Sequence, residues 1–292
     1  MKEQEWLAEQ FEENRGHLRG VAYRMLGSLS EADDAIQETW LRLSRSDASG
    51  IENLEGWLTT VVARVCLDML RSRASRREET LDSPASEPVV NSASGRDPEQ
   101  EALLADSVGI ALLVILDRLA PAERLAFVLH DIFAMPFEEI ASIVGRSPAA
   151  ARQLASRARR RVQAPAAVSD LSGQRSVVEA FLAALRSGDF EGLLAVLDPD
   201  VVVRIDEAAA RPGGPREIRD ARNWAKGAIA FSRYVRFVEP ALVNGAVGLI
   251  WAPKGRLARA LTFTIANGRI LQANVVADPA RLRQLDLATL QN

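Results

Sequence analysis

Residues 136–162 read PFEEIASIVGRSPAAARQLASRARRRV, and this stretch decides how the middle of the chain folds. A short helix with apolar periodicity ends at Gly145, a residue that can supply a tight turn. Ser147 is placed to cap the next helix, whose first residue is Pro148. The spacing therefore predicts a helix-turn-helix. The inward stripe of its second helix is predicted to consist of Ala151, Leu154, Ala158 and Val162.

The outward face of the second helix carries charge of one sign. Six arginines and no acid lie between Arg146 and Arg161. Such a helix suits the major groove of DNA, where its first side chains can read base edges and later arginines can hold phosphates. A merely solvated basic helix is the alternative. The residues predicted to contact DNA are Arg146, Ser147, Arg152, Gln153, Ser156, Arg157 and Arg160.

Residues 5–77 carry apolar side chains at three- and four-residue spacing, which predicts a compact helical domain. Ser30, followed by acids, is expected to cap a helix that begins near residue 31. The apolar positions of this pattern are Trp6, Phe11, Leu18, Val21, Ala22, Met25, Leu26, Ala35, Ile36, Trp40, Leu41 and Leu43. The following helix, from Gly56 to Arg73, is expected to bury Trp57, Val61, Val65 and Leu70.

A second basic segment runs from Arg64 to Arg77, where five arginines accompany one acid, Asp68. The whole chain has a net charge of -3, but net charge averages over domains, and the local distribution decides where a polyanion can bind. This segment is therefore a second candidate surface for phosphates. Its basic positions are Arg64, Arg71, Arg73, Arg76 and Arg77.

The length of 292 residues, with 48% hydrophobic and 26% charged side chains, predicts two or three domains. Serine, proline and acids dominate residues 79–100, and a shorter Ala/Pro/Ser-rich stretch covers residues 165–174, so both are predicted to be linkers. We expect a multidomain chain with two all-α domains, at 1–78 and 101–164, followed by an α+β domain at 175–292. The second all-α domain is predicted to contain four helices.

The last domain combines one helix pattern with segments of strand character. Asn267-Gly268 is typical of a tight hairpin turn. The predicted strands are Val201–Ile205, Val235–Val238, Val247–Trp251, Leu261–Ile265 and Ile270–Val276.

The chain contains no run of about 18 apolar residues, and its N-terminus is acidic, so we expect a cytoplasmic protein with no membrane partner. Its single cysteine, Cys66, cannot form a disulfide or a cysteine zinc cluster within the chain. We expect Cys66 to pack as a small apolar residue of the core.

Three segments resemble the extracytoplasmic-function class of the sigma-70 family: DDAIQETWLRL at 33–43, GWLTTVVARVCLDMLRSR at 56–73, and the helix-turn-helix. The resemblance implies a subunit that binds core RNA polymerase and promoter DNA and performs no covalent chemistry. It also implies that the acidic helix binds the polymerase, and an exposed acidic helix suits a basic partner surface. A solvated acidic face is the alternative. The implied polymerase-binding residues are Asp33, Asp34, Gln37, Glu38 and Trp40.

The same resemblance assigns the two arginine-rich surfaces to two promoter elements. The helix at 56–73, with the preceding loop Ser44–Asn53, would recognise and open the minus-10 element, and the helix-turn-helix would read the minus-35 element. Strand opening suits this chemistry, because it needs basic tracks for the backbone and surfaces for flipped bases.

Residues 175 to about 285 resemble the SnoaL-like fold, a cone of curved sheet and helices that one subgroup of these sigma factors carries. The segment Asp278–Leu282 is similar to the NPDKL-type motif of that subgroup, and Asp206–Ala210 is a variant of its DGGG-type motif. Glu87-Pro88-Val89-Val90 resembles the end of its WLPEPVV-like motif, with Ala85-Ser86 in place of Trp-Leu. The resemblance implies that this domain regulates the sigma factor in cis, and an unknown small molecule is a candidate ligand.

Acid-base catalysis in the last domain would need Asp206, Glu207 or Asp220, because both histidines, His17 and His130, lie upstream. Nucleotide-binding signatures are missing, so no cofactor, metal or catalytic residue is expected. Two alternatives stay open. One is a one-component regulator that binds a palindromic operator as a dimer and senses a small molecule. The other is a SnoaL-like enzyme with an attached DNA-binding region.

Overall fold

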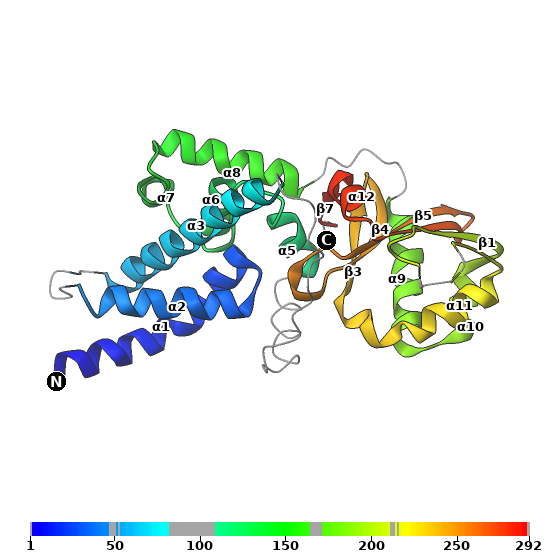
Figure 1. The fold of residues 1–292 in the computed structure, drawn as a ribbon, viewed down its shortest axis with the longest axis horizontal. Helices are drawn as coiled ribbons and strands as arrows, with labels where there is room; N and C mark the ends of the chain where they lie inside the picture. Colours follow the sequence, from blue (N-terminus) through cyan, green and yellow to red (C-terminus); the bar gives the residue numbers. More distant parts are fainter. Residues whose placement is uncertain are drawn as a thin grey trace. The chain divides into compact units, whose positions relative to one another are not determined.

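A computed structural model describes residues 2–46, 51, 53–81, 109–163, 171–210, 214 and 216–290. These residues form two compact units (Figure 1). The helical unit comprises Met1–Glu101 and Leu116–Arg159, and the sheet unit comprises Ala102–Ile115 and Arg160–Asn292. The predicted order, helical regions followed by an α+β region, is confirmed.

The helical unit is built on three long helices that pack against one another. They are α1 (Lys2–Leu26), α2 (Leu29–Leu43) and α3 (Leu54–Leu81). Shorter elements from residues 121–162 pack on them, with α3 contacting both α6 and α7 and α1 contacting η2. These elements are α6 (Pro121–Phe127), the π-helix η2 (Val128–Ile132), α7 (Phe137–Val144) and α8 (Pro148–Val162).

Most of the predicted apolar stripe is buried, but two of its positions are exposed and Trp40 is half-buried. Trp6 is 51% exposed and Leu41 is 37% exposed, because they lie on the solvent side of α1 and α2. Trp57, near the start of α3, is half-buried. The prediction that Ser30 caps a helix beginning near residue 31 is wrong: α2 begins at Leu29, and Ser28 is the residue before it. The backbone of Ser28 is extended, and its side chain makes no capping hydrogen bond.

Cys66 lies in the core of this unit, as expected. Burial raises the pKa of the Cys66 thiol to about 12, because a thiolate would lose its hydration there. Cys66 therefore stays protonated at neutral pH.

The sheet unit contains seven strands in the order β2-β1-β6-β5-β4-β3-β7. β1 runs parallel to β6, and the other neighbours are antiparallel. Asn267 and Gly268 both adopt positive φ and join β5 to β6, which confirms the predicted hairpin turn. The strands are β1 (Leu197–Ile205), β2 (Glu217–Arg219), β3 (Val238–Val243), β4 (Ala246–Trp251), β5 (Arg259–Ala266), β6 (Arg269–Val276) and β7 (Leu287–Ala288).

One face of this sheet, here called the inner face, is covered by helices and filled with apolar side chains such as Phe181, Trp224 and Leu249. The helices are α9 (Leu171–Ser187), α10 (Phe190–Val196) and α11 (Ala221–Ala230). The prediction of a strand at Val235–Val238 is wrong: residues Ser232–Phe237 form the 3-10 helix η3, and β3 begins at Val238. The strands β2 and β7 and three further helices, α10, α11 and α12 (Pro279–Gln284), had no predicted counterpart. Apart from α11, these segments are too short to carry a clear periodicity.

The element boundaries differ from the predicted linkers at two places. α3 continues to Leu81, beyond the expected end at residue 78, and α9 begins at Leu171, inside the expected linker 165–174. Helix α5 (Ile110–Leu116) lies, up to Ile115, in the sheet unit rather than with the other helices of residues 101–164. The three-domain division stays a prediction.

Candidate functional site

The predicted helix-turn-helix is present. Gly145 ends α7 with a left-handed φ of 68°, and α8 begins at Pro148. The Ser147 hydroxyl oxygen accepts a hydrogen bond from the Ala150 N–H at 3.2 Å, so Ser147 caps α8. The buried stripe consists of Ala151, Ala155, Ala158 and Val162. Ala155 takes the place predicted for Leu154, which is half-buried, since a small alanine lets α8 lie close to its neighbours.

All seven residues predicted to contact DNA on this helix-turn-helix are exposed. Arg152 is oriented by two neighbours from α7: its Nη2 lies 2.9 Å from the Glu138 carboxylate, and its guanidinium lies 5.4 Å from the centre of the Phe137 ring. Arg159, which is partly exposed, forms an ion pair with Asp131. The exposed arginines therefore project from a rigidly packed helix.

The arginines of α3 do not all share one environment. Arg64, Arg71 and Arg76 are exposed, and Arg71 lies 3.8 Å from Asp68. Arg73 is half-buried: it donates to the Leu26 carbonyl oxygen and pairs with Glu31. Arg73 therefore ties α3 to the end of α1 and the start of α2. The Arg77 side chain lies outside the described residues.

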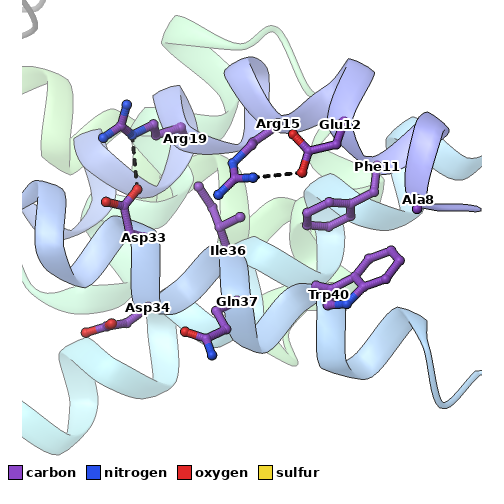
Figure 2. A pocket seen from close by; sticks show the side chains of 10 residues that line it. All are labelled: Ala8, Phe11, Glu12, Arg15, Arg19, Asp33, Asp34, Ile36, Gln37 and Trp40. Atoms are coloured by element: carbon purple, nitrogen blue, oxygen red, sulfur yellow. Dashed lines mark hydrogen bonds and ion pairs between the residues drawn. The ribbon is translucent and has the colours of Figure 1, made fainter.

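The acidic helix α2 forms one wall of a groove of about 500 Å³ whose other wall is α1 (Figure 2). Asp33 faces Arg19 of α1, with 3.1 Å between carboxylate oxygen and Nε, and Trp40 packs edge-on against Phe11 at 5.1 Å. Ion pairs and ring contacts of this kind hold the two helices in register. The groove is lined by Ala8, Phe11, Glu12, Arg15, Arg19, Asp33, Asp34, Ile36, Gln37 and Trp40.

The five polymerase-binding candidates on α2 divide into two groups. Asp34 and Gln37 are exposed, and Glu38 is partly exposed in an ion pair with Arg42 at 2.9 Å. Asp33 and Trp40 are half-buried by their partners on α1. The contribution of α1 to this surface was not predicted, although Arg15 and Arg19 lie four residues apart on one helix face.

Comparisons with known proteins agree with this geometry. The family Sigma-70 region 2 matches residues 10–76, which include α2 and four of the five arginines of α3, and Sigma-70 region 4 matches residues 110–162, which include the helix-turn-helix. The ECF RNA polymerase sigma factor SigJ of Mycobacterium tuberculosis is 37% identical over 92% of this chain and 91% of its own length. The chain belongs to the ECF RNA polymerase sigma factors.

Other relatives show the same likeness. The probable ECF RNA polymerase sigma factor SigI of Mycobacterium tuberculosis is 36% identical, over 93% of each chain. A crystal structure of Mycobacterium tuberculosis SigJ covers 94% of this chain and 98% of its own, with 36% identity and a TM-score of 0.45. The sigma factor works with core RNA polymerase and promoter DNA in transcription initiation. No helix within the described residues is long and apolar enough to span a membrane.

Two motifs of the sigma factor that lie about seventy residues apart meet in the sheet unit. The carboxylate of Asp206, at the end of β1, accepts hydrogen bonds from the N–H groups of Ala209, Ala277 and Asp278 at 2.9, 2.8 and 2.9 Å. Asp278 in turn caps α12 by accepting from the Arg281 N–H at 2.8 Å. The Asp206–Ala210 and Asp278–Leu282 segments therefore form one structural junction.

The sheet unit also holds both ends of the segment matched by region 4. At one end, the Glu239 carboxylate of β3 accepts a hydrogen bond from the Ala111 N–H of α5 at 2.9 Å. At the other end, the last residue of α8, Val162, accepts from the Thr289 N–H and hydroxyl at 3.1 and 3.0 Å. The C-terminal domain is thus joined to region 4 by specific hydrogen bonds as well as by the chain.

The start of helix α5 contacts the outer face of this sheet, opposite the helices of the inner face, through the Glu239–Ala111 hydrogen bond. Glu239 shares the outer side of the strands with Ala241, Ile250 and Ala260, because alternate residues of a strand face the same way. These three are fully buried although they lie outside the inner core cluster. Nearly all of α5 is buried and apolar, as expected for a helix with protein on several sides.

Proposed function

We propose that the sigma factor binds core RNA polymerase through the exposed row Asp34, Gln37 and Glu38 of α2. The observation that supports this is that some candidate side chains of α2 contact α1 while the others face solvent. Asp33 and Trp40 hold α2 against α1, so the remaining acids are presented in a fixed position beside the groove. A preorganised acidic row suits a basic partner surface, because it loses little side-chain entropy on binding.

We propose that Arg64, Arg71 and Arg76 of α3 contact the promoter at the minus-10 element, while Arg73 stabilises the fold. The first three are exposed on one long helix, whereas Arg73 is engaged with Leu26 and Glu31. A role for Arg77 stays a prediction. So does base recognition by the loop Ser44–Asn53, because most of that loop lies outside the described residues.

The double variant Arg64→Ala/Arg71→Ala tests the minus-10 surface. Each lost phosphate contact removes about 0.9 from the slope of log affinity against log salt, so the slope for promoter binding by the holoenzyme should fall by about 1.8. The charge-matched double variant Arg269→Ala/Arg283→Ala, on exposed positions of the sheet unit, should leave the slope unchanged. An equal slope in all three proteins would exclude α3 as a phosphate-binding surface. Arg73→Ala should instead lower the melting temperature.

The exposed face of α8 is proposed to read the minus-35 element. Arg152 and Gln153 lie in the first turns of α8, which is the end that a recognition helix points at base edges. Arg157 and Arg160 follow one and two turns later, in positions suited to phosphates, and Arg146 and Ser147 lie in the turn before the helix.

Regulation in cis by the C-terminal domain is proposed to act through its hydrogen bonds to the two ends of region 4. The Glu239–Ala111 and Thr289–Val162 hydrogen bonds link the sheet to the first and last helices of that region. A change in the sheet unit would therefore move the ends of the minus-35-binding segment. A contact whose strength depends on the state of both parts couples their equilibria, which is the physical basis of allosteric regulation.

The variant Glu239→Ala tests this link. It removes the acceptor for the Ala111 N–H of α5, and it should alter transcription from a cognate promoter in a reconstituted assay with core polymerase. Asp189→Ala is the matched control, because Asp189 caps α10 within the C-terminal domain by accepting from the Gly192 N–H at 2.9 Å. Each substitution should cost about 1 kcal/mol of stability. Equal promoter output from both variants would contradict regulation through this contact.

The sigma factor is further proposed to have no enzymatic activity and no cofactor. The three acids that catalysis would need have other engagements: Asp206 accepts three backbone N–H groups, exposed Glu207 pairs with Arg216 at 2.8 Å, and Asp220 caps α11. A carboxylate whose oxygens already accept three backbone N–H groups has little room left to accept a proton from a substrate. A small-molecule ligand of this domain stays a prediction. Because it works with RNA polymerase on promoters, the protein is proposed to act in the cytoplasm.

A further inference from the structure

Arg152 of α8, which is proposed to read a base, is held from two sides by the helix that precedes it. Its guanidinium carbon lies over the Phe137 ring, 5.4 Å from the ring centre, and its Nη2 donates a hydrogen bond to the Glu138 carboxylate at 2.9 Å. A cation within about 6 Å of a ring centre is attracted to the face of the ring. Phe137 and Glu138 are the first two residues of α7, so both partners belong to the helix-turn-helix itself.

The Phe137 ring is in turn fixed by a histidine. The His130 ring of η2 stacks on it, with 3.8 Å between the ring centres and 29° between the planes. His130 has an anchor of its own, because its Nδ1 lies 3.1 Å from the Met135 carbonyl oxygen and can donate a hydrogen bond to it. A chain of contacts therefore runs from His130 through Phe137 to Arg152.

The Arg152–Glu138 pair lies open to solvent. The two side chains are 55% and 64% exposed, and an ion pair this exposed adds little to stability. Asp131, which pairs with Arg159 of the same helix, is only 20% exposed. The fold thus gains little from the Arg152–Glu138 contact, while the guanidinium stays within reach of DNA. Among the residues that the structure describes, no ring contact or ion pair holds the other exposed arginines predicted to contact DNA, which are Arg146, Arg157 and Arg160.

The contact with Glu138 leaves most donors of Arg152 available. A guanidinium carries five N–H donors, and the hydrogen bond to Glu138 uses one of them, on Nη2. A guanidinium held at its face and at one nitrogen has lost much of its freedom before DNA arrives. Less entropy is therefore lost when its remaining donors bind a base.

We propose that Phe137 and Glu138 are positioning residues that present Arg152 to a guanine of the minus-35 element. Guanine is the base whose O6 and N7 accept paired hydrogen bonds from arginine. A loosely held arginine can turn to phosphates of any sequence, whereas an arginine held in one orientation favours the base that offers both acceptors. The inference rests on the proposed reading of the minus-35 element by α8, and it adds the base and the two residues that make its reading selective.

The test measures discrimination between bases rather than affinity alone. Reconstituted holoenzyme is titrated with the cognate promoter and with promoters in which each minus-35 base pair is replaced in turn. The position at which Arg152→Ala no longer discriminates is the one that Arg152 reads, and we expect guanine there. At that position, the ratio of cognate to substituted affinity should fall by about two- to tenfold in Glu138→Ala, the effect of freeing one long side chain.

Glu139→Ala is the matched control, because it removes the same charge from the adjacent exposed position of α7. Loss of either acid weakens the repulsion of DNA on all promoters alike, so Glu139→Ala should leave the ratio unchanged. Glu138→Gln keeps an oxygen acceptor for Arg152 and should retain more of the ratio than Glu138→Ala. When Arg152 is already alanine, Glu138→Ala should have no effect on the ratio, since no arginine remains to be positioned.

An unchanged or increased ratio in Glu138→Ala would overturn the proposal, because Glu138 would then only compete with DNA for Arg152. A base other than guanine at the position read by Arg152 would overturn it as well. Phe137→Leu should lower the ratio and Phe137→Tyr, which keeps a ring, should not; equal ratios in these two variants would remove Phe137 from the proposal. Discrimination by Arg152→Ala equal to wild type at every position would instead contradict the proposed function itself.

Discussion

Reversing the charge of Asp34 and Glu38 together, as Asp34→Arg/Glu38→Arg, is expected to weaken binding to core RNA polymerase by at least about a hundredfold. Both side chains lie on the outer side of α2, whose position is set by the Asp33–Arg19 and Trp40–Phe11 contacts. The variant replaces attraction to a basic surface by repulsion and leaves those contacts in place. Titration of labelled protein with core polymerase measures the effect.

The control for this variant is Glu179→Arg/Glu191→Arg, two exposed helical acids of the sheet unit. Glu179 pairs with Arg175 four residues away, as Glu38 pairs with Arg42, so the local cost to the helix is matched at a few tenths of a kcal/mol. Both double variants should melt close to wild type. Tight polymerase binding by Asp34→Arg/Glu38→Arg would remove α2 from the polymerase interface.

Replacing Arg152 and Gln153 by alanine is expected to lower initiation from a promoter with its cognate minus-35 element by at least about 30-fold, because each of the two base-reading side chains contributes about 1–3 kcal/mol of discrimination. The loss should be confined to the cognate sequence, since base contacts specify while phosphate contacts position. A set of promoters with single minus-35 substitutions, assayed with reconstituted holoenzyme, measures both the rate and the specificity.

Arg157→Ala provides the contrast. It removes an exposed arginine from the same helix at a position suited to phosphate, so initiation should fall by a similar factor on every promoter of the set. If Arg152→Ala/Gln153→Ala lost activity uniformly, those residues would hold the backbone rather than read bases. The variant also removes the contacts of the Arg152 side chain with Glu138 and Phe137. A melting curve therefore checks that the helix-turn-helix stays folded.

Local patterns were sufficient for the elements whose rules are local. Helix periodicity, the Gly145 turn, the Ser147 cap and the Asn267-Gly268 hairpin depend on residues a few positions apart, and all four were predicted correctly. Short segments without periodicity were missed, which is why β2, β7 and η3 were not anticipated.

The sequence by itself determined that this protein has helical parts followed by an α+β part. It also determined that two clusters of arginine and one acidic helix face carry exposed charge. Only the tertiary structure decided which of those charges are engaged. Arg73 and Arg124 look like other arginines in the sequence, yet both are drawn into the end of α1. Likewise Glu239 and Asp206 act on partners about 128 and 72 residues away. Charge pairing and burial depend on which distant segments meet in space, and no spacing rule within one helix or strand contains that information.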